Sequence, residues 1–258
     1  ESAPTMELLV LLVLLAGGPG TAIRDIPLDM APKSFDDQYR RCQDRMLRAL
    51  PELNRTETPN NPLFAQVWAK ATPEWQKVRD YGLRPEEVTA LRVYTMNTDV
   101  YGQFNTATRE AGSSSCQYRN NFHYKVLHFL LTTAVQKVGG GCHRVYRGIQ
   151  GIRFTAQLGD TVRFGQFASS SKKKNQAEKF GTDTLFEVNT CHGASIQDFS
   201  PFPSQEEVLI PPYETFKVTR ITSQGEKTQI QLESHSVYSN YSCEYLRGDT
   251  PGVGTGTG

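Results

Sequence analysis

Two glutamates lie side by side at the start of an apolar run in "FPSQEEVLIPP", residues 202–212. The run is typical of a buried strand. Carboxylates at the edge of such a strand cost free energy unless water, a partner or a substrate meets them. A fixed carboxylate can also stabilise positive charge that develops during a reaction. Gln205, Glu206 and Glu207 are therefore the first candidates for a site.

Two other stretches carry residues of similar interest. "VYRGIQG" places Arg147 near the end of an expected strand, and "FGQFASSS" places Ser169 and Ser171 together. A guanidinium fork is well shaped to hold phosphate oxygens. Taken singly, Arg147 and Glu207 are explained as well by a strand-edge ion pair, and the serines by hydroxyls in a turn. Their function can be interpreted only when the three stretches are considered together.

Several common chemistries lack their signals. The sequence has no GxSxG elbow, no phosphate-binding P-loop and no GxGxxG after a strand. It has no CxxC and no Cys/His pair at zinc spacing, so we expect no metal site. His128 lies on a long apolar helix, which favours packing over catalysis. Lys and Arg total 28 against 27 for Asp and Glu, so charge gives no case for a nucleic-acid or membrane-surface partner.

The first half of the chain shows helical periodicity. In "SFDDQYRRCQDRMLRALP", residues 34–51, apolar side chains recur every three to four positions. Ser34 with Asp37 predicts a capping box, and Pro51 predicts the end of the helix. "TPEWQK" predicts a second helix start with Thr72 as N-cap. "NNFHYKVLHFLLTTAVQKVGGG" predicts a long helix that its glycines end.

From Cys142 on, short segments rich in β-branched and aromatic residues predict strands. They are "HRVYRGI", "DTVRFGQF", "TLFEVNT", "EEVLI", "ETFKVTRI", "KTQIQLE" and "YSCEYL". Helices first and strands second indicate the α+β class. We expect a single domain over residues 23–247, mostly helical over 23–138 and mostly β over 139–247. A flexible tail, 248–258, should follow.

The beginning of the chain is typical of a secretory signal peptide. In "MELLVLLVLLAGGPGTA" the apolar run Leu8–Ala16 is too short to span a bilayer, and small residues follow it up to Ala22. A buried core helix is the alternative. We expect a leader over residues 1–22, a secreted or extracellular-surface location, and no transmembrane segment in the mature chain.

An oxidising compartment lets cysteines pair. The chain has five, and their spacing alone does not choose the pairs. Two glycosylation sequences, Asn54-Arg-Thr and Asn240-Tyr-Ser, agree with the secretory route.

The order of Arg147, Ser169 and Glu207 resembles the Arg–Ser–Glu motifs of the vertebrate ecto mono-ADP-ribosyltransferases, relatives of the cholera-toxin-type enzymes. The blocks "IPLDMAPKSFDDQY", "ALPELN", "YTMNTDVYGQFN", "REAG", "KVLHFLL" and "NYSCEY" also resemble that family. The resemblance covers about Ile26 to Tyr245. It implies the ADP-ribosyltransferase fold, in which a helical N-terminal part precedes a two-sheet β-sandwich core around an NAD+ cleft.

The resemblance implies NAD+ as a substrate, with no bound prosthetic group. Nicotinamide would leave through an oxocarbenium-like transition state, which Glu207 would stabilise. Arg147 would hold phosphate oxygens, and Ser169 would support Glu207 and the nicotinamide ribose. The Gly148 backbone would grip the carboxamide, and Phe180 would stack on nicotinamide.

The family also implies the disulfides. Cys42 with Cys243 would join the helical start to the last strand, and Cys142 with Cys191 would brace the segment that carries the site. Cys116 would remain as a free or modified thiol on an exposed loop.

The function implied is a secreted or surface NAD+-dependent mono-ADP-ribosyltransferase that modifies arginine in extracellular proteins. Arginine-modifying members carry Glu-x-Glu where this chain has Gln205-Glu206-Glu207. Gln205, the acceptor-recognition position, accepts hydrogen bonds but carries no charge. Strand alternation should point Glu206 away. Predominant NAD+ glycohydrolysis is therefore the alternative, because family members with Gln-x-Glu favour it. A non-catalytic surface scaffold is the second alternative.

Overall fold

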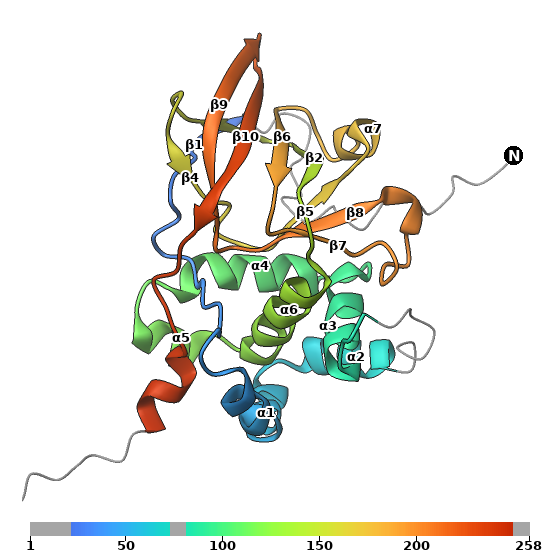
Figure 1. Cartoon of the computed structure of the whole chain (residues 1–258), viewed down its shortest axis with the longest axis vertical. Helices are drawn as coiled ribbons and strands as arrows, with labels where there is room; N and C mark the ends of the chain where they lie inside the picture. The colour runs from blue at the N-terminus through green and yellow to red at the C-terminus, as the bar shows by residue number, and fades with distance from the viewer. Residues whose placement is uncertain (1–21, 73–80, 250–258) are drawn as a thin grey trace, which may run out of the picture.

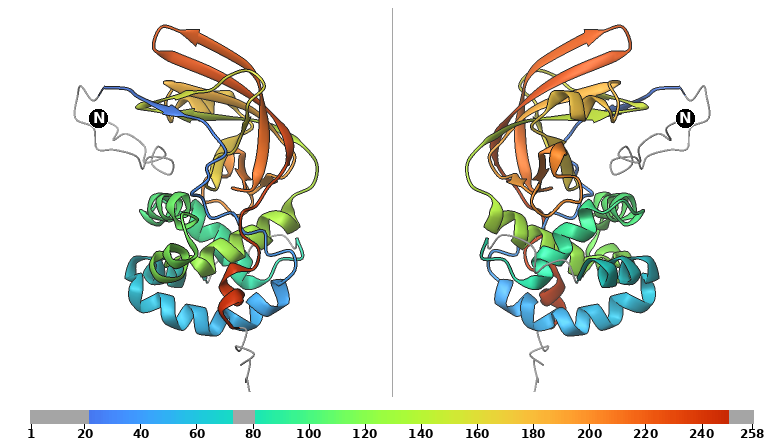
Figure 2. Two further views of the ribbon diagram at one scale, coloured as in Figure 1. Left: turned by 90° about the vertical axis from the view of Figure 1, so that its left-hand side faces the viewer. Right: turned by 90° about the vertical axis from the view of Figure 1, so that its right-hand side faces the viewer.

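The computed structural model describes residues 22–72 and 81–249. The leader expected over residues 1–22 lies outside this part except for its last residue, and so does most of the expected tail. Figures 1 and 2 show most of the helices in one half of the molecule and the main sheet in the other. No helix of the described residues is long and apolar enough to cross a membrane.

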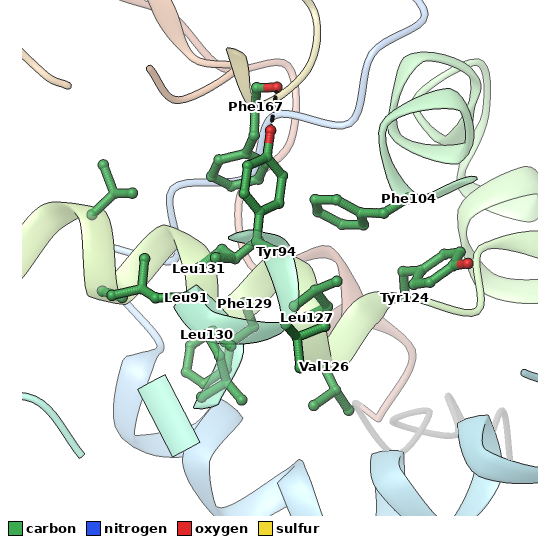
Figure 3. Packing of buried hydrophobic residues seen from close by; sticks show 14 of the residues in the cluster. Leu91, Tyr94, Phe104, Tyr124, Val126, Leu127, Phe129, Leu130, Leu131 and Phe167 are labelled. Carbon is green, nitrogen blue, oxygen red and sulfur yellow. Dashed lines mark hydrogen bonds between the residues drawn. The ribbon is translucent and has the colours of Figure 1, made fainter. Parts of the chain in front are cut away.

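Along the chain, the helical half comes after a first short strand and before the main sheet. Strand β1 spans Arg24–Pro27, and the α-helices that follow it in the described part are α1 Gln43–Glu57, α2 Pro62–Ala71, α3 Pro85–Thr95, α4 Val100–Ala111, α5 Ser115–Asn121 and α6 Lys125–Val138. A 3-10 turn, η1, spans Thr58–Asn60. These helices cover one apolar core, whose rings and aliphatic side chains Figure 3 shows.

Helix α6 is the centre of that core. Its residues from Lys125 to Val135 are buried, as the apolar sequence predicts, and it ends before Gly139. Glu57, also buried, accepts hydrogen bonds from the backbone N–H groups of Lys125 and Val126 at 2.7 and 3.1 Å. A carboxylate from a distant helix thus caps the start of α6.

The predicted boundaries of the first helix are wrong at both ends. Helix α1 begins at Gln43, and Pro51 lies within it. Ser34 does not cap a helix, because its hydroxyl donates to the carbonyl of Gly165 at 2.7 Å. Asp37 binds its own local backbone at Tyr39. Tertiary hydrogen bonds thus hold the first eight or so residues of the expected helix in another conformation.

Thr72 follows the last turn of α2, and its hydroxyl donates to the carbonyl of Trp68 at 2.9 Å. The helix expected from Pro73 lies outside the described residues.

The second half confirms the α+β class. Its strands are β2 His143–Ile149, β3 Ile152–Thr155, β4 Thr161–Val162, β5 Ala168–Ser171, β6 Thr184–Thr190, β7 Ala194–Ser195, β8 Glu207–Ile210, β9 Glu214–Gln224 and β10 Lys227–Val237. Eight of these form one sheet in the order β4-β9-β10-β6-β2-β5-β8-β7, and β1 pairs with β3 in a second, parallel sheet. A single residue pair, Tyr146 with Ser171, joins β2 to β5. The two halves of the large sheet therefore meet at one point, beside which α7 (Lys174–Glu178) lies.

The strand predicted for "YSCEYL" is not a strand. Residues Glu244–Asp249 form a 3-10 helix, η4, and Cys243 before it has a positive φ of 56°. The buried Asp37 carboxylate accepts the backbone N–H of Glu244 at 3.0 Å, so a side chain takes the place of a neighbouring strand. The Cys42–Cys243 disulfide consequently joins the start of α1 to η4. The second disulfide, Cys142–Cys191, is also present.

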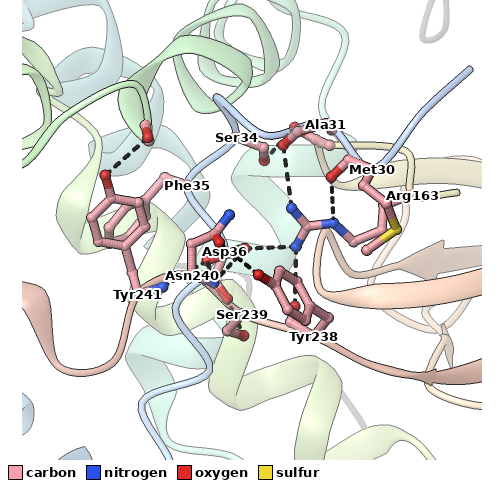
Figure 4. Close-up of polar contacts among 12 residues, drawn as sticks. Met30, Ala31, Ser34, Phe35, Asp36, Arg163, Tyr238, Ser239, Asn240 and Tyr241 are labelled. Carbon is pink, nitrogen blue, oxygen red and sulfur yellow. Dashed lines mark hydrogen bonds and ion pairs between the residues drawn. The ribbon is translucent and has the colours of Figure 1, made fainter. Parts of the chain in front are cut away.

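One fully buried ion pair ties the two ends of the domain together. Arg163 and Asp36 approach to 2.6 Å, and Arg163 also donates to the carbonyls of Met30 and Tyr238 at 2.8 and 3.0 Å. Figure 4 shows these contacts between the segment before α1, the residue after β4 and the segment after β10. Removing one partner of such a pair would leave an uncompensated buried charge.

Candidate active site

A solvent-open cleft of about 280 Å³ lies where β2, β5 and β8 meet α7. Every site residue expected from the sequence lines it: Arg147, Gly148, Ser169, Phe180, Gln205 and Glu207. The sequence also placed Ser171 beside Ser169, but it did not single out the remaining lining residues, which are Tyr146, Ser170, Gln176 and Ala177. The sheet order explains this convergence, because β5 lies between β2 and β8 and brings three distant segments together.

Three of the residues that line the cleft are joined by hydrogen bonds. The Ser169 hydroxyl donates to Oε1 of Glu207 at 2.5 Å, and Nη1 of Arg147 donates to the Ser169 carbonyl at 2.6 Å. All three residues are buried. Hydrogen bonds of this kind fix the position of a carboxylate before any substrate binds.

Burial also changes the acidity of Glu207. Desolvation raises the pKa of its carboxyl to about 7, although the Ser169 hydrogen bond and the charge of Arg147 both act to lower it. Near neutral pH the free site therefore exchanges a proton, and the carboxylate form dominates only above this value. A perturbed carboxyl in a cleft is a common property of functional sites.

Gly148 is required by the packing of α7. A Cβ at this position would lie 2.3 Å from the carbonyl oxygens of Ala177 and Gly181. Because no side chain fits there, the segment that carries Phe180 lies directly against β2. Gly181 has a φ of 123°, and its own Cβ would collide with Gln150. These two glycines bring the Phe180 side of the cleft within reach of Arg147.

Gln205 enters the cleft from a turn. It ends a short 3-10 helix, η3 (Pro203–Gln205), and its carbonyl accepts the Ser171 hydroxyl at 2.6 Å. The side chain is buried, and its Oε1 has no hydrogen-bond partner among the described residues. An unpaired buried amide oxygen costs free energy, which a bound donor would recover.

Glu206 lies in a left-handed conformation, with φ 47° and ψ 52°, and not in an extended strand. Its carboxylate lies outside the cleft, as the sequence predicted. The reason is the turn, and not the alternation of side chains along a strand. Oε1 of Glu206 lies 2.9 Å from Nζ of Lys173. The Lys173 ammonium thus offsets the charge that is nearest in sequence to Gln205.

Arg109 of α4 is not among the residues that line the cleft. Its guanidinium donates to Oε1 of Gln166 and to the Thr106 hydroxyl. Burial lowers the pKa of Arg109, while Tyr101 acts to raise it and the charge of Arg147 acts to lower it.

His128 and Cys116 lie outside the cleft. Burial lowers the pKa of His128 to about 3, and its ring lies between the Tyr39 hydroxyl and the Phe35 carbonyl, which agrees with a packing role. Cys116 is an exposed free cysteine on helix α5, where a loop was expected.

Residues 28–240 match the sequence model of the family "NAD:arginine ADP-ribosyltransferase". The chain belongs to this family. A chicken relative, erythroblast NAD(P)(+)--arginine ADP-ribosyltransferase, is 47% identical over 236 residues, which cover 87% of this chain and 78% of the relative. A mouse relative, GPI-linked NAD(P)(+)--arginine ADP-ribosyltransferase 1, is 45% identical over 87% of this chain and 74% of its own.

Among solved structures, the eukaryotic mono-ADP-ribosyltransferase ART2.2 is similar, with a TM-score of 0.76 and 39% sequence identity. The match covers 85% of this chain and 99% of ART2.2. A variant of ART2.2 in complex with NAD matches equally well, at a TM-score of 0.76. The fold of this family member is therefore the ADP-ribosyltransferase fold.

Proposed function

We propose that this protein is an extracellular NAD+-dependent mono-ADP-ribosyltransferase that transfers ADP-ribose to arginine and hydrolyses NAD+ in competition. The observation that carries the proposal is the buried Ser169–Glu207 hydrogen bond beside Arg147, on the three strands that form the cleft. Family membership supports the same activity. The relatives named as GPI-linked, together with two disulfides, support an extracellular location.

In this proposal NAD+ is the substrate, and the chain supplies binding and electrostatics. Arg147 holds phosphate oxygens through charge-assisted hydrogen bonds. The Gly148 backbone holds the carboxamide, and Phe180 stacks on the nicotinamide ring. Both residues line the cleft together with Arg147.

Glu207 then stabilises the step that breaks the bond between ribose C1′ and the nicotinamide nitrogen. The bonding electrons leave with nicotinamide, which becomes neutral, and positive charge spreads over C1′ and the ring oxygen. The ionised Glu207 carboxylate offsets that charge, and Ser169 fixes its position. A guanidinium nitrogen of the acceptor bonds to C1′ and loses a proton; with water in its place, the product is free ADP-ribose.

Gln205 favours hydrolysis as a second activity. An acceptor guanidinium is cationic, and Gln205 offers it one unpaired oxygen with no charge. The adjacent Glu206 carboxylate is engaged by Lys173. Transfer to arginine therefore lacks one charge-assisted contact, which is worth about 1.5–3 kcal/mol.

Release of nicotinamide from NAD+ by the purified protein tests the proposal. Glu207→Gln should abolish both hydrolysis and transfer, because no other carboxylate of the described residues lines the cleft. The matched control is Glu206→Gln, which changes the neighbouring carboxylate outside the cleft and should leave NAD+ turnover nearly unchanged. A wild-type protein that releases no nicotinamide would favour a non-catalytic scaffold.

A further inference from the structure

The segment after β10 places an exposed aromatic ring beside a possible modification site. Tyr238 is 48% exposed and, with Leu158, makes up the exposed large hydrophobic side chains of the described residues. Its hydroxyl donates to Oδ1 of Asn240 at 2.9 Å. Asn240 is followed by Tyr241 and Ser242, which completes an acceptor sequence for N-glycosylation.

Both residues are fixed to the buried ion pair described above. The backbone N–H of Asn240 donates to both carboxylate oxygens of Asp36 at 2.9 Å. The Arg163 guanidinium lies 5.2 Å from the centre of the Tyr238 ring and donates to the Tyr238 carbonyl. Figure 4 shows the ring and the amide on this common support. One face of the ring is therefore covered by Arg163, and the exposed area belongs to the rest of the ring.

The hydrogen bond from Tyr238 also orients the Asn240 amide. Because Oδ1 accepts from the ring hydroxyl, the amide is held close to the ring. Nδ2, the atom that N-glycosylation modifies, makes no hydrogen bond to the described part of the chain. Asn240 is exposed, so a group attached to Nδ2 has room beside Tyr238.

We propose that Asn240 carries an N-linked glycan and that its first N-acetylglucosamine packs an apolar C–H face against the Tyr238 ring, which stabilises the fold. In the transfer, Nδ2 bonds to C1 of a lipid-pyrophosphate-linked oligosaccharide and loses a proton. The C1–phosphate bond breaks, and the lipid pyrophosphate leaves. The sugar then covers apolar ring surface that otherwise faces water.

The other acceptor sequence lacks such a support. Asn54 is exposed on helix α1, and its carbonyl accepts the Thr58 hydroxyl at 2.7 Å. Among the exposed large hydrophobic side chains of the described residues, Tyr238 is the only aromatic one. A glycan on Asn54 should therefore leave stability unchanged, which makes Asn54→Gln a matched control.

Modification at Asn240 is compatible with the proposed activity. In Figure 1 the segment after β10 runs down the left of the molecule, whereas α7, which borders the cleft, lies on the right. The inference rests on the secretory route of the proposed function, and not on catalysis. Nicotinamide release is measured beside it, so an inactive but glycosylated protein would count against the proposed function alone.

The test uses the full chain secreted from mammalian cells that retain high-mannose glycans. Peptide mapping should find a glycan on Asn240. An amidase that removes the whole glycan should lower the unfolding midpoint by about 2–4 °C, the scale of one ring contact in a domain of this size. An endoglycosidase that leaves the first N-acetylglucosamine should not lower it.

Variants assign the effect to the ring. The midpoint loss should persist in Tyr238→Phe and Asn54→Gln, and should vanish in Tyr238→Ala and Asn240→Gln. The amidase converts Asn240 to aspartate in Tyr238→Ala as well, so that comparison controls for the added charge. An unmodified Asn240, or an equal midpoint loss in wild type and Tyr238→Ala, would overturn the inference.

Discussion

Replacing Gln205 by glutamate should raise the transfer of ADP-ribose to an arginine mimic such as agmatine by at least tenfold. The two half-reactions need different residues. Nicotinamide departure depends on Glu207, whereas the choice of arginine over water depends on what meets the acceptor two residues earlier. A glutamate at position 205 would add charge beside the acceptor and leave the NAD+ side of the cleft as it is.

The surroundings of Gln205 predict that this substitution does not disturb the turn. Its backbone is held by Ser171, which donates to its carbonyl, and by the Phe202 carbonyl, which accepts its N–H at 3.1 Å. Glutamate and glutamine have nearly the same shape, and Oε1 of Gln205 makes no hydrogen bond within residues 22–72 and 81–249 that would be lost. The change is therefore one of charge.

The magnitude follows from that charge. A hydrogen bond to an ionised group contributes about 1.5–3 kcal/mol, which corresponds to roughly tenfold to more than a hundredfold in rate. The new carboxylate would also raise the pKa of Glu207, which burial already brings to about 7. The assay should therefore be run near pH 9, where Glu207 is ionised in both proteins.

Labelled ADP-ribose on agmatine and free ADP-ribose are measured together for wild type and variant. NAD+ consumption without acceptor should change much less than transfer. Glu206→Gln, alone and combined with Gln205→Glu, is the control, because Lys173 already engages that carboxylate. If wild type transfers to agmatine as readily as Gln205→Glu, another group supplies the charge and the interpretation of Gln205 is wrong.

Three further predictions follow from buried groups. Since Glu207 acts as a carboxylate with a pKa of about 7, NAD+ turnover should increase as the pH rises through that value. Ser169→Ala removes a hydrogen bond that lowers this pKa, so it should move the midpoint of the kcat/KM profile to higher pH. An unchanged midpoint would contradict this assignment. Gly148→Ala should lower kcat/KM for NAD+ by about a hundredfold, because a Cβ 2.3 Å from two carbonyl oxygens displaces α7 from β2. Gly140→Ala is the control and should match wild type, because a Cβ there meets no atom of the described residues within 4 Å. Asp36→Asn should lower the free energy of unfolding by about 3–5 kcal/mol in denaturant titrations, since it leaves Arg163 buried without its counter-charge. A loss below about 1 kcal/mol would show that this ion pair does not hold the two ends of the domain together.

The sequence by itself determined the family, the α+β class and several of the residues that line the cleft. Arg147, Ser169 and Glu207 were recognisable because each stands in a short block of characteristic residues. Helix α6 and most strands followed from local periodicity, since burial of a whole helix or of alternate strand positions leaves a pattern in neighbouring residues. The departure at Gln205 was also visible, because a change of charge at a motif position needs no coordinates.

Tertiary structure alone decided the features that depend on contacts between distant segments. The start of α1 was misplaced because Ser34 binds Gly165, and "YSCEYL" was misread because the Asp37 carboxylate binds the backbone of Glu244. Neither partner lies near enough in sequence to leave a local pattern. The acidity of Glu207 was likewise hidden, because it is set by the desolvation that the assembled sheet imposes. Sequence records the chemistry that each side chain can supply, whereas its distance from water and from other charges exists only after the chain has folded.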